Sequence, residues 1–374
     1  MTEASVRYWT DEPLPRDVRA ALERLARSDD VRRIAVMPDV HLSADVCVGT
    51  VLATSRSLYP NAVGGDIGCG VAALAFDCDT AGLDERSAAA ILAGLYREIP
   101  LVRHARIRAR GLPDELAART LSAPALESLK KEAVLQLGTL GRGNHFVELQ
   151  ADENDGRLWL MLHSGSRGIG QAIRDHHLAK GATSRVGLRF LDAESNEGTE
   201  YLADMAWALD YADASRRAMI GAARDVVGRA LGAAAVEESY VACQHNHVRR
   251  EVHEGEAFWV HRKGAISAAA GEAGIVPGSM GTRSFHVEGR GCAEALASSA
   301  HGAGRRLSRT DARRTLSVRD VVSELRGVWF DHRIAAGLRE EAPSAYKDID
   351  GVLRAQAELV RIVRRLRPLL SYKG

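Results

Sequence analysis

His301 stands in a stretch of sequence that leaves room around a histidine side chain. In SSAHGAGRRLSR, residues 298–309, small residues lie on both sides of His301, and Arg305 and Arg306 follow closely. Small side chains clear space around the imidazole, and glycine lets a backbone come close to a ligand. The two guanidinium groups supply fixed positive charge for a phosphate. The segment therefore raises the question of which chemistry needs a histidine in open space beside a phosphate-binding group.

A second pair of residues could bind a metal ion. Asp66 and Cys69 are separated by two residues in GGDIGCG, residues 64–70, whose glycines allow the backbone to aim both side chains at one point. A carboxylate and a thiolate together suit a divalent transition metal. Taken alone, the pair is better explained by a cysteine packed in the core and an aspartate that caps a turn.

Three histidines change that interpretation. His145, His163 and His245 each lie beside a predicted strand in a segment rich in glycine or asparagine, so together with Asp66 and Cys69 they favour a metal site. Five ligands exceed what one tetrahedral ion needs, which suits two ions that share the Cys69 thiolate as a bridge. Spacing does not exclude three competing ligands: His247, His253 and His261. Six other histidines are interpreted as structural: His41, His104, His176, His177, His286 and His332.

Further polar residues could hold a nucleotide or its phosphates. Asn144 and Glu148 flank His145; an asparagine can bind phosphate, and a glutamate can accept hydrogen bonds from a base or ribose. Ser279 lies between glycines in IVPGSMGT, where backbone N–H groups can face an anion. Lys263 and Arg305 could neutralise the charge on a transferring phosphoryl group.

Short apolar runs predict the strands that must position these residues: 32–37, 70–76, 157–162 and 257–260. The polar clusters lie at the ends of these runs, where loops on a rigid scaffold commonly carry chemistry. Helical periodicity covers 84–99, with Asp84 as the expected cap, and also 199–231 and roughly 348–368. Residues 180–198 are expected to form an exposed loop, and Lys373, in the final SYKG, would ordinarily lie in a frayed tail.

The order and composition of these elements predict an α+β fold, with a mixed β-sheet core and surrounding helices in one domain over residues 1–374. The hydrophobic fraction of 46% is sufficient for a sizeable core. The polar N-terminus and the lack of long apolar runs favour a cytoplasmic protein, and five cysteines without a CxxC pair argue against disulfides. The net charge of +1 requires any polyanion site to be local. Basic residues cluster within 305–314 and within 361–367, and the second cluster could equally be the solvated face of a C-terminal helix.

Together these clusters resemble the RtcB family of RNA-splicing ligases. The segments that carry the resemblance are MPDVH, GGDIGCG, GTLGRGNHFVEL, HSGSRG, QHN, WVHRKGA, PGSMGT, SSAHGAGRRLSR, EEAPSAYKDID and the terminal YKG. They run in family order from residue 37 to the C-terminus, about nine-tenths of the chain. One such glycine-rich fragment would be weak evidence, whereas ten in order are highly specific.

The resemblance implies an RtcB-like fold and an enzyme that joins an RNA end bearing a 2′,3′-cyclic phosphate or 3′-phosphate to a 5′-hydroxyl end. The implied cofactors are GTP and two Mn²⁺ ions, and the implied intermediate is a guanylylated histidine at His301. Broken tRNA or rRNA would be the substrate. The metal ligands carried over from the family are Asp66, Cys69 as the bridge, His145, His163 and His245. Residues at positions that contact the guanylate are Asn144, Glu148, Ser279, Gly302, Ala303, Gly304, Arg305, Tyr346 and Lys373. Lys263 matches a basic residue near the phosphates, and Asp39 matches a carboxylate close to the site.

Two departures from the family pattern indicate a divergent branch in a somewhat short chain. LSADVCVGTVLA follows MPDVH where the family has a glycine-rich stretch, and PNAVGGDI replaces the usual SPGGVGYDI. Because the catalytic set is intact, we expect activity, with substrate choice open. Two alternatives stay open: a metal-dependent phosphodiesterase that opens cyclic phosphates without ligation, and a non-catalytic RNA-binding protein. The first needs the metal ligands but not His301, and the second needs neither.

Overall fold

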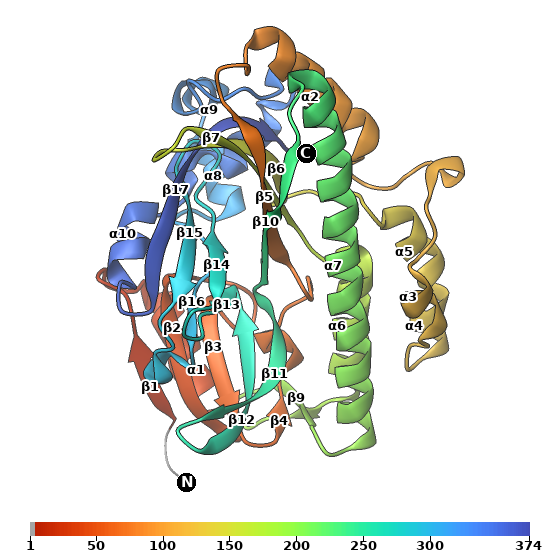
Figure 1. Cartoon of the computed structure of the whole chain (residues 1–374). Coiled ribbons are helices and arrows are strands. Elements are labelled where there is room, and N and C mark those ends of the chain that lie inside the picture. Colours follow the sequence, from red (N-terminus) through yellow and green to blue (C-terminus); the bar gives the residue numbers. More distant parts are fainter. Residues whose placement is uncertain (1–3) are drawn as a thin grey trace.

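Two β-sheets lie at the centre of the computed structural model, which describes residues 4–374 (Figure 1). The five-stranded sheet has the order β1 (Ser5–Tyr8), β2 (Val31–His41), β3 (Val48–Thr54), β12 (Glu256–Lys263), β11 (Asn246–His253). The seven-stranded sheet has the order β10 (Ala235–Gln244), β5 (Gly70–Asp79), β7 (Arg157–Ser164), β6 (Phe146–Asp152), β17 (Val360–Tyr372), β15 (Ser284–Gly289), β14 (Ala273–Val276). Two small sheets pair β13 (Ala265–Ser267) with β16 (Ser298–Ala300), and β4 (Ser57–Leu58) with β9 (Arg189–Asp192) and β8 (Ala182–Thr183). Only β1 and β2 pair in parallel among the named strands.

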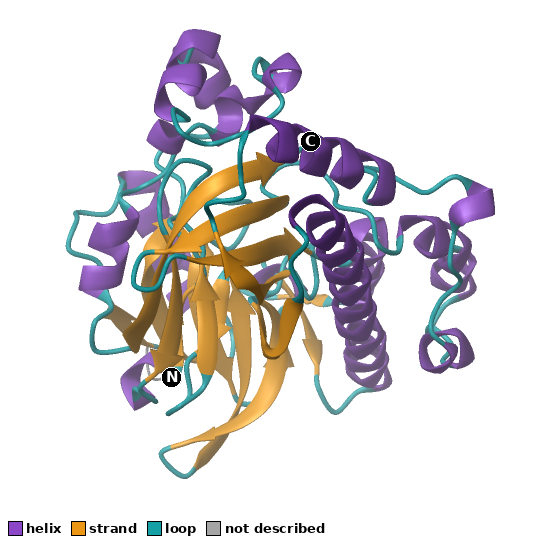
Figure 2. Ribbon diagram, turned by 45° about the horizontal axis from the view of Figure 1, so that its top comes forward, coloured by secondary structure: helices purple, strands orange, loops and turns teal. Residues whose placement is uncertain are grey.

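Helices surround these strands, as Figure 2 shows, so the α+β prediction is confirmed. The α-helices are α1 (Arg16–Ala26), α2 (Glu85–Glu98), α3 (Asp114–Ala118), α4 (Pro124–Ser128), α5 (Lys130–Gln136), α6 (Arg167–Lys180), α7 (Asn196–Leu231), α8 (Arg309–Thr315), α9 (Val318–Glu324) and α10 (Ile349–Ala355). Short 3-10 helices cover Pro60–Ala62, Arg106–Arg108, Ala293–Ala295, His332–Ile334, Gly337–Glu341 and Pro343–Ala345. No helix in residues 4–374 has both the length and the apolar content that a membrane crossing requires.

Local sequence signals define several of these elements. The Asp84 side chain accepts from the Ser87 N–H at the start of α2, as the capping prediction requires. The predicted helix at 199–231 is α7, with Ser195 as its N-cap. Its C-cap is Gly232, whose φ of 70° lies in the left-handed region. All four predicted strands are present as β2, β5, β7 and β12.

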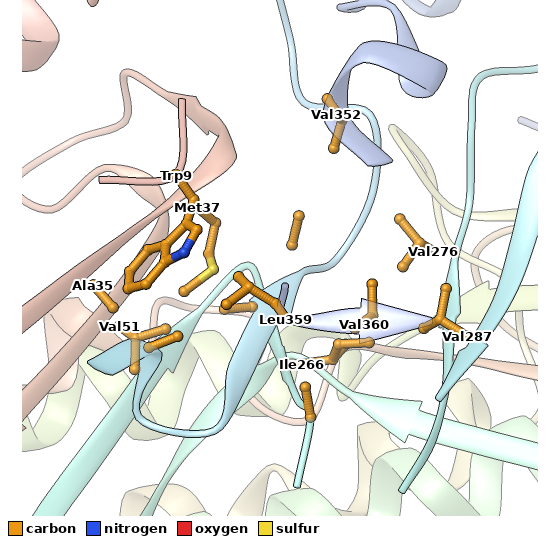
Figure 3. Close-up of a cluster of buried hydrophobic side chains, with 14 of the residues drawn as sticks. Trp9, Ala35, Met37, Val51, Ile266, Val276, Val287, Val352, Leu359 and Val360 are labelled. Carbon is orange, nitrogen blue, oxygen red and sulfur yellow. The ribbon is translucent and has the colours of Figure 1, made fainter. Parts of the chain in front are cut away.

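The strand β5 is apolar without alternation because both of its faces are covered. Leu74 and Phe76 pack in the cluster that includes α2 and α7 side chains, whereas Val71 and Ala73 pack against Trp159 on the other face. Burying a side chain as large as those of Val71, Leu74 and Phe76 stabilises the fold by about 1.5–3 kcal/mol. A further apolar cluster, drawn in Figure 3, joins β2 and β3 of the smaller sheet to β14, β15 and β17 of the larger one. The two sheets are therefore held together by packed side chains.

Two predictions about elements are wrong. The helix expected at 348–368 ends at Ala355, and the basic residues within 361–367 lie on β17, which pairs with β6 and β15. Backbone pairing with two neighbouring strands outweighs the helical periodicity there. The exposed loop expected at 180–198 contains β8 and β9 and buries Leu188 and Leu191. The five cysteines are all free, as predicted.

Candidate active site

The five predicted metal ligands converge, although they come from four separate parts of the chain. Asp66 and Cys69 lie in the turn that leads into β5, and His145 immediately precedes β6. His163 is near the end of β7, and His245 lies where the chain leaves the larger sheet at β10 and enters the smaller one at β11. Adjacent strands of the larger sheet thus bring distant segments to one place.

The ligand atoms form two groups that share one sulfur. Cys69, His163 and His245 form one group, and Asp66, Cys69 and His145 form the other; within each, the ligand atoms lie within 4.8 Å of one another. The Cys69 Sγ is 3.2 Å from the His163 Nε2 and 3.5 Å from the His145 Nε2. This is the arrangement in which one thiolate can bridge two cations.

Hydrogen bonds to backbone carbonyls orient two of the imidazoles. The His145 Nδ1 donates to the Leu140 carbonyl at 3.0 Å, and the His163 Nδ1 donates to the Asn144 carbonyl at 3.1 Å. A carbonyl oxygen can only accept, so Nδ1 carries a proton in both rings, and the His163 Nε2 keeps its lone pair. The His145 Nε2 lies 2.9 Å from the Asp66 Oδ2, so in the absence of a cation a proton on that nitrogen joins the two side chains. Both Nε2 atoms face Cys69, which is how metal-binding histidines are commonly held.

Burial favours the uncharged forms of most of the candidate ligands while no cation is bound. Burial lowers the pKa values of His163 and His245 well below their usual range and raises the pKa of the Cys69 thiol well above its own. Burial alone would also raise the pKa of Asp66, but the hydrogen bond and charge of His145 outweigh it and lower that pKa to about 2. The buried Asp66 Oδ1 has no hydrogen-bond partner among the described residues. Three imidazoles, a carboxylate and a thiol with this geometry fit divalent metal ions, whose binding would displace the protons.

A buried arginine that sequence reasoning missed fixes the backbone beneath the ligands. The Arg216 Nη1 donates to the Gly68 carbonyl at 2.6 Å and to the Ser164 carbonyl at 3.0 Å. Gly68 precedes Cys69, and Ser164 follows His163, so this one side chain of α7 holds both segments. Its position within an Ala-rich helical pattern carried no local signal of this contact.

His301 lies beside the ligand groups and is held by Asp39. The His301 Nδ1 donates to the Asp39 Oδ2 at 2.7 Å, and this leaves its Nε2 with a free lone pair. The His301 and His245 rings have their centroids 4.6 Å apart. Asp39 is fully buried, and Gly304 packs so closely that an added Cβ would lie 2.2 Å from the Asp39 backbone oxygen. Only glycine fits there, which explains part of the HGAGR pattern.

One cavity of about 1120 Å³ contains most of the predicted site. Residues from both ligand groups line it, namely Asp66, Cys69, His163 and His245. The predicted nucleotide-binding residues that line it are Asn144, Glu148, Lys263, Ser279, His301, Gly302, Ala303, Gly304, Arg305, Tyr346 and Lys373. Asp39 lies behind His301 rather than on the cavity wall. A volume of this order accommodates a nucleotide together with part of a second substrate.

Glu341, which was not predicted as a site residue, forms ion pairs with three cationic side chains that line the cavity. Its carboxylate bonds to Lys373 Nζ at 2.8 Å and to Tyr346 OH at 2.6 Å. Arg309 and Arg305 approach it at 2.9 and 3.3 Å. Glu341 lies in the segment EEAPSAYKDID, from which only Tyr346 was predicted, and its role depends on partners such as Lys373. Lys373 is buried in this network, so the frayed-tail interpretation is wrong.

Two further groups in the cavity have shifted pKa values. Burial raises the pKa of Glu148 to about 8, although Gln150 and Lys373 act in the opposite direction. Burial lowers the pKa of Lys263 to about 8, and its Nζ donates to the Val46 carbonyl at 2.7 Å. Ionisable groups perturbed in this way are typical of binding sites.

The competing histidines do not belong to either ligand group. His253 bonds to Glu251 at 3.0 Å, and His261 accepts from the Tyr59 N–H at 3.0 Å. His247 is buried on β11, and neither of its ring nitrogens has a partner within the part of the chain described. The structure therefore places the five predicted ligands together and these three elsewhere.

Comparisons of the sequence with known proteins give one consistent family. A family model described as tRNA-splicing ligase RtcB matches residues 21–125 and 117–374. An RNA-splicing ligase RtcB from Escherichia coli strain K12 is 38% identical over 408 aligned residues, covering 99% of this chain and 98% of that protein. RNA-splicing ligase RtcB1 of Escherichia coli strain ATCC 25922 is 38% identical with the same coverage. RNA-splicing ligase RtcB of Mycobacterium tuberculosis is 32% identical, covering 92% of this chain and 97% of that protein.

Proposed function

Because the chain belongs to the RtcB family, we propose that it is an RNA ligase that joins 3′-phosphate or 2′,3′-cyclic phosphate ends to 5′-hydroxyl ends, using GTP. The observation that carries this proposal is the position of His301. Its ring lies against His245 of one ligand group, and its Nε2 is free, within a cavity that Arg305 and Lys373 also line. Fragments of tRNA or rRNA are the proposed substrates, and a cytoplasmic location belongs to the same proposal.

The first proposed step is guanylylation of His301. The lone pair on Nε2 attacks the α-phosphorus of GTP, a phosphorus–nitrogen bond forms, and the bond to the bridging oxygen breaks to release pyrophosphate. Asp39 accepts a hydrogen bond from Nδ1 at 2.7 Å, so it orients the ring and stabilises the positive charge that develops. Arg305 provides a fixed guanidinium for the phosphates.

The remaining steps transfer the guanylate and then expel it. An oxygen of the RNA 3′-phosphate attacks the phosphorus on His301, and the phosphorus–nitrogen bond breaks to regenerate the imidazole. The RNA 5′-hydroxyl then attacks the activated 3′-phosphate, forming the phosphodiester and releasing GMP. A 2′,3′-cyclic end must first be opened by water to a 3′-phosphate.

Two divalent ions would be held by Asp66, Cys69, His145, His163 and His245. When bound, they would supply positive charge to phosphoryl oxygens and help to orient the reacting groups. Manganese as the metal rests on the family resemblance, since mixed O, N and S donors bind zinc more tightly. Glu148, Asn144, Ser279 and Tyr346 are the proposed contacts for the guanosine and its phosphate.

Labelled GTP tests the proposal directly. Incubation of the protein with α-³²P-GTP and Mn²⁺ should produce an acid-labile labelled protein, and addition of RNA with the matching ends should discharge the label into a joined product. His301→Ala should abolish both signals, a loss of at least about 10³-fold. The matched control is His332→Ala at an exposed histidine, which should label normally.

The labelling experiment also separates the alternatives. A phosphodiesterase without ligase activity predicts that His301→Ala still opens cyclic phosphates and that the wild-type protein is never labelled. Absence of label on the wild type, with full metal loading and an active ligase as positive control, would refute the proposal.

A further inference from the structure

Four arginines lie on one exposed segment between α2 and α3. This segment, residues 102–110, which we call the arginine loop, includes the 3-10 turn Arg106–Arg108. Figure 1 shows it, in gold, projecting from the edge of the molecule. Its four charged members are all exposed: Arg103, Arg106, Arg108 and Arg110. Its sequence, VRHARIRAR, concentrates positive charge in a chain whose net charge is only +1.

The charges of the arginine loop are not neutralised by ion pairs. Across residues 4–374, no carboxylate lies within 4.0 Å of any of the four guanidinium groups. Two carboxylates are in the neighbourhood: Glu98, which is paired with Arg97 at 2.8 Å, and Glu132, which shares the lining of a small cavity of about 290 Å³ with Arg103 and Arg106. By contrast, Arg309 of the other basic cluster is paired with Glu340 and Glu341.

The base of the arginine loop is hydrogen-bonded to the segment that leads to Asn144 in the cavity wall. The Leu101 carbonyl accepts from the Gly141 N–H at 2.9 Å, and Gly141 begins the segment that leads to Asn144 and His145. The His104 N–H donates to the Leu135 carbonyl at 2.8 Å, which holds the loop near its start. Arg142, also exposed, adds a positive charge to this segment two residues before Asn144, which lines the cavity. The arginine loop is thus hydrogen-bonded at its base to a segment that carries a further positive charge and leads to the Asp66–His145 group.

We propose that the arginine loop binds the phosphate backbone of an RNA strand whose end lies in the cavity. This inference rests on the proposed function. Planar guanidinium groups suit phosphate, and a row of positive charge beside a site that takes a strand end is how proteins follow single-stranded nucleic acid without reading its sequence. An acidic protein partner is less well matched, because Ile107, 94% exposed, is the one large apolar side chain at the tip and supplies little of the apolar centre of a protein interface.

The test compares RNA binding and guanylylation in a variant that combines Arg103→Ala, Arg106→Ala, Arg108→Ala and Arg110→Ala. RNA affinity at low salt, measured by fluorescence anisotropy on a long 3′-phosphate strand, should fall about tenfold or more. The slope of log K against log salt should shrink by about 0.7 for each phosphate that the variant no longer neutralises. Guanylylation by GTP without RNA should keep its wild-type rate, because the loop lies outside the cavity. A short oligonucleotide that cannot reach the loop should bind both proteins equally.

Two control variants exclude general charge and folding effects. Replacing all four arginines by lysine should keep most of the affinity and the salt slope. Replacing four unpaired exposed arginines elsewhere by alanine (Arg27, Arg86, Arg249 and Arg290) makes the same change in net charge and should leave the salt slope close to wild type.

The inference is overturned if the loop variant keeps the wild-type salt slope, if the control set weakens binding equally, or if the weaker binding persists with the short oligonucleotide. Loss of binding to a protein partner with RNA affinity unchanged would also overturn it. A wild-type protein that binds RNA through the loop but is never guanylylated would refute the proposed function and leave the inference intact.

Discussion

At the scale of single residues, the protonation states in the cavity depend on desolvation. Glu148 is 3% exposed, and its carboxylate accepts from the Gln150 Nε2 at 2.6 Å. That hydrogen bond and the charge of Lys373 favour ionisation, but the loss of hydration is larger, and the pKa rises to about 8. In the free enzyme Glu148 is therefore mostly protonated at neutral pH, and a ligand that donates hydrogen bonds would favour its ionised form.

This shift predicts a pH-dependent cost to stability. The pKa of Glu148 is higher in the folded protein than in the unfolded chain, so the unfolded chain releases its proton first as pH rises. The free energy of unfolding is therefore not reduced by this group below about pH 4.5, and it declines as pH rises toward about 8. In Glu148→Gln, the loss of unfolding free energy between pH 5 and pH 8 should be smaller than in the wild type by on the order of 1–3 kcal/mol. Urea unfolding of both proteins at the two pH values, without GTP, measures this. Parallel pH profiles would contradict the assignment.

At the scale of secondary-structure elements, α7 both covers the larger sheet and supports the site. Met219, Ala223 and Val227 of this 36-residue helix pack in the cluster beneath β5, while Arg216 on the same helix reaches the backbone beside Cys69 and His163. A helix of this length has side chains both in the apolar core and beside the candidate metal ligands. The site geometry therefore depends on the same packing that stabilises the sheet.

Substitution within α7 tests this dependence. Arg216→Met keeps the length of the side chain but leaves the Gly68 and Ser164 carbonyls without their donor, and we expect a loss of about 2–4 kcal/mol in unfolding free energy. Mn²⁺ affinity should fall by about tenfold or more, because the loops that carry the ligands are no longer fixed. The adjacent Arg217→Ala removes an exposed ion pair with Asp213 and a cation–π contact with Tyr240, neither of which touches the ligand segments, and should change both quantities much less. Equal effects of the two substitutions would argue against the supporting role.

At the scale of the whole molecule, the cavity lies where the two large sheets meet. Cys69, His145 and His163 belong to segments next to strands of the larger sheet, while Asp39 lies on β2 of the smaller one. His245 lies on the connection between them. Ions bound by these ligands would join segments far apart in the sequence, so metal binding should be linked to global stability.

Metal binding should therefore raise the melting temperature. Mn²⁺ at about 100 times its dissociation constant should stabilise the wild-type protein by about 2.7 kcal/mol, and a chelator should reverse the effect. Because Cys69 belongs to both ligand groups, Cys69→Ala should remove the metal-dependent shift almost entirely. Calorimetry with and without metal measures it. Cys47→Ala is the matched control, since Cys47 is equally buried but lies outside both ligand groups; it should lower the baseline and keep the shift.

The sequence by itself indicated which residues could carry the chemistry and many of the elements that hold them. Polar residues at the ends of apolar runs supplied the candidate ligands and most of the residues that line the cavity, because glycine-rich turns next to strands leave local signals. The choice of three among the histidines came from the family resemblance, since spacing did not exclude His247, His253 and His261. The N-terminal cap of α2 at Asp84 could also be predicted from the sequence, since capping depends on a few adjacent residues.

Only the tertiary structure decided contacts made between distant segments. Residues 360–372 form a strand rather than a helix because β6 and β15 supply backbone partners that periodicity does not register. Likewise, Arg216 and Glu341 are ordinary charged residues in the sequence, and their roles come from burial against carbonyls and cations far along the chain. Side-chain type and local spacing can be read directly from neighbouring residues in the sequence. Strand pairing, burial and desolvation depend on residues that only the whole fold brings together.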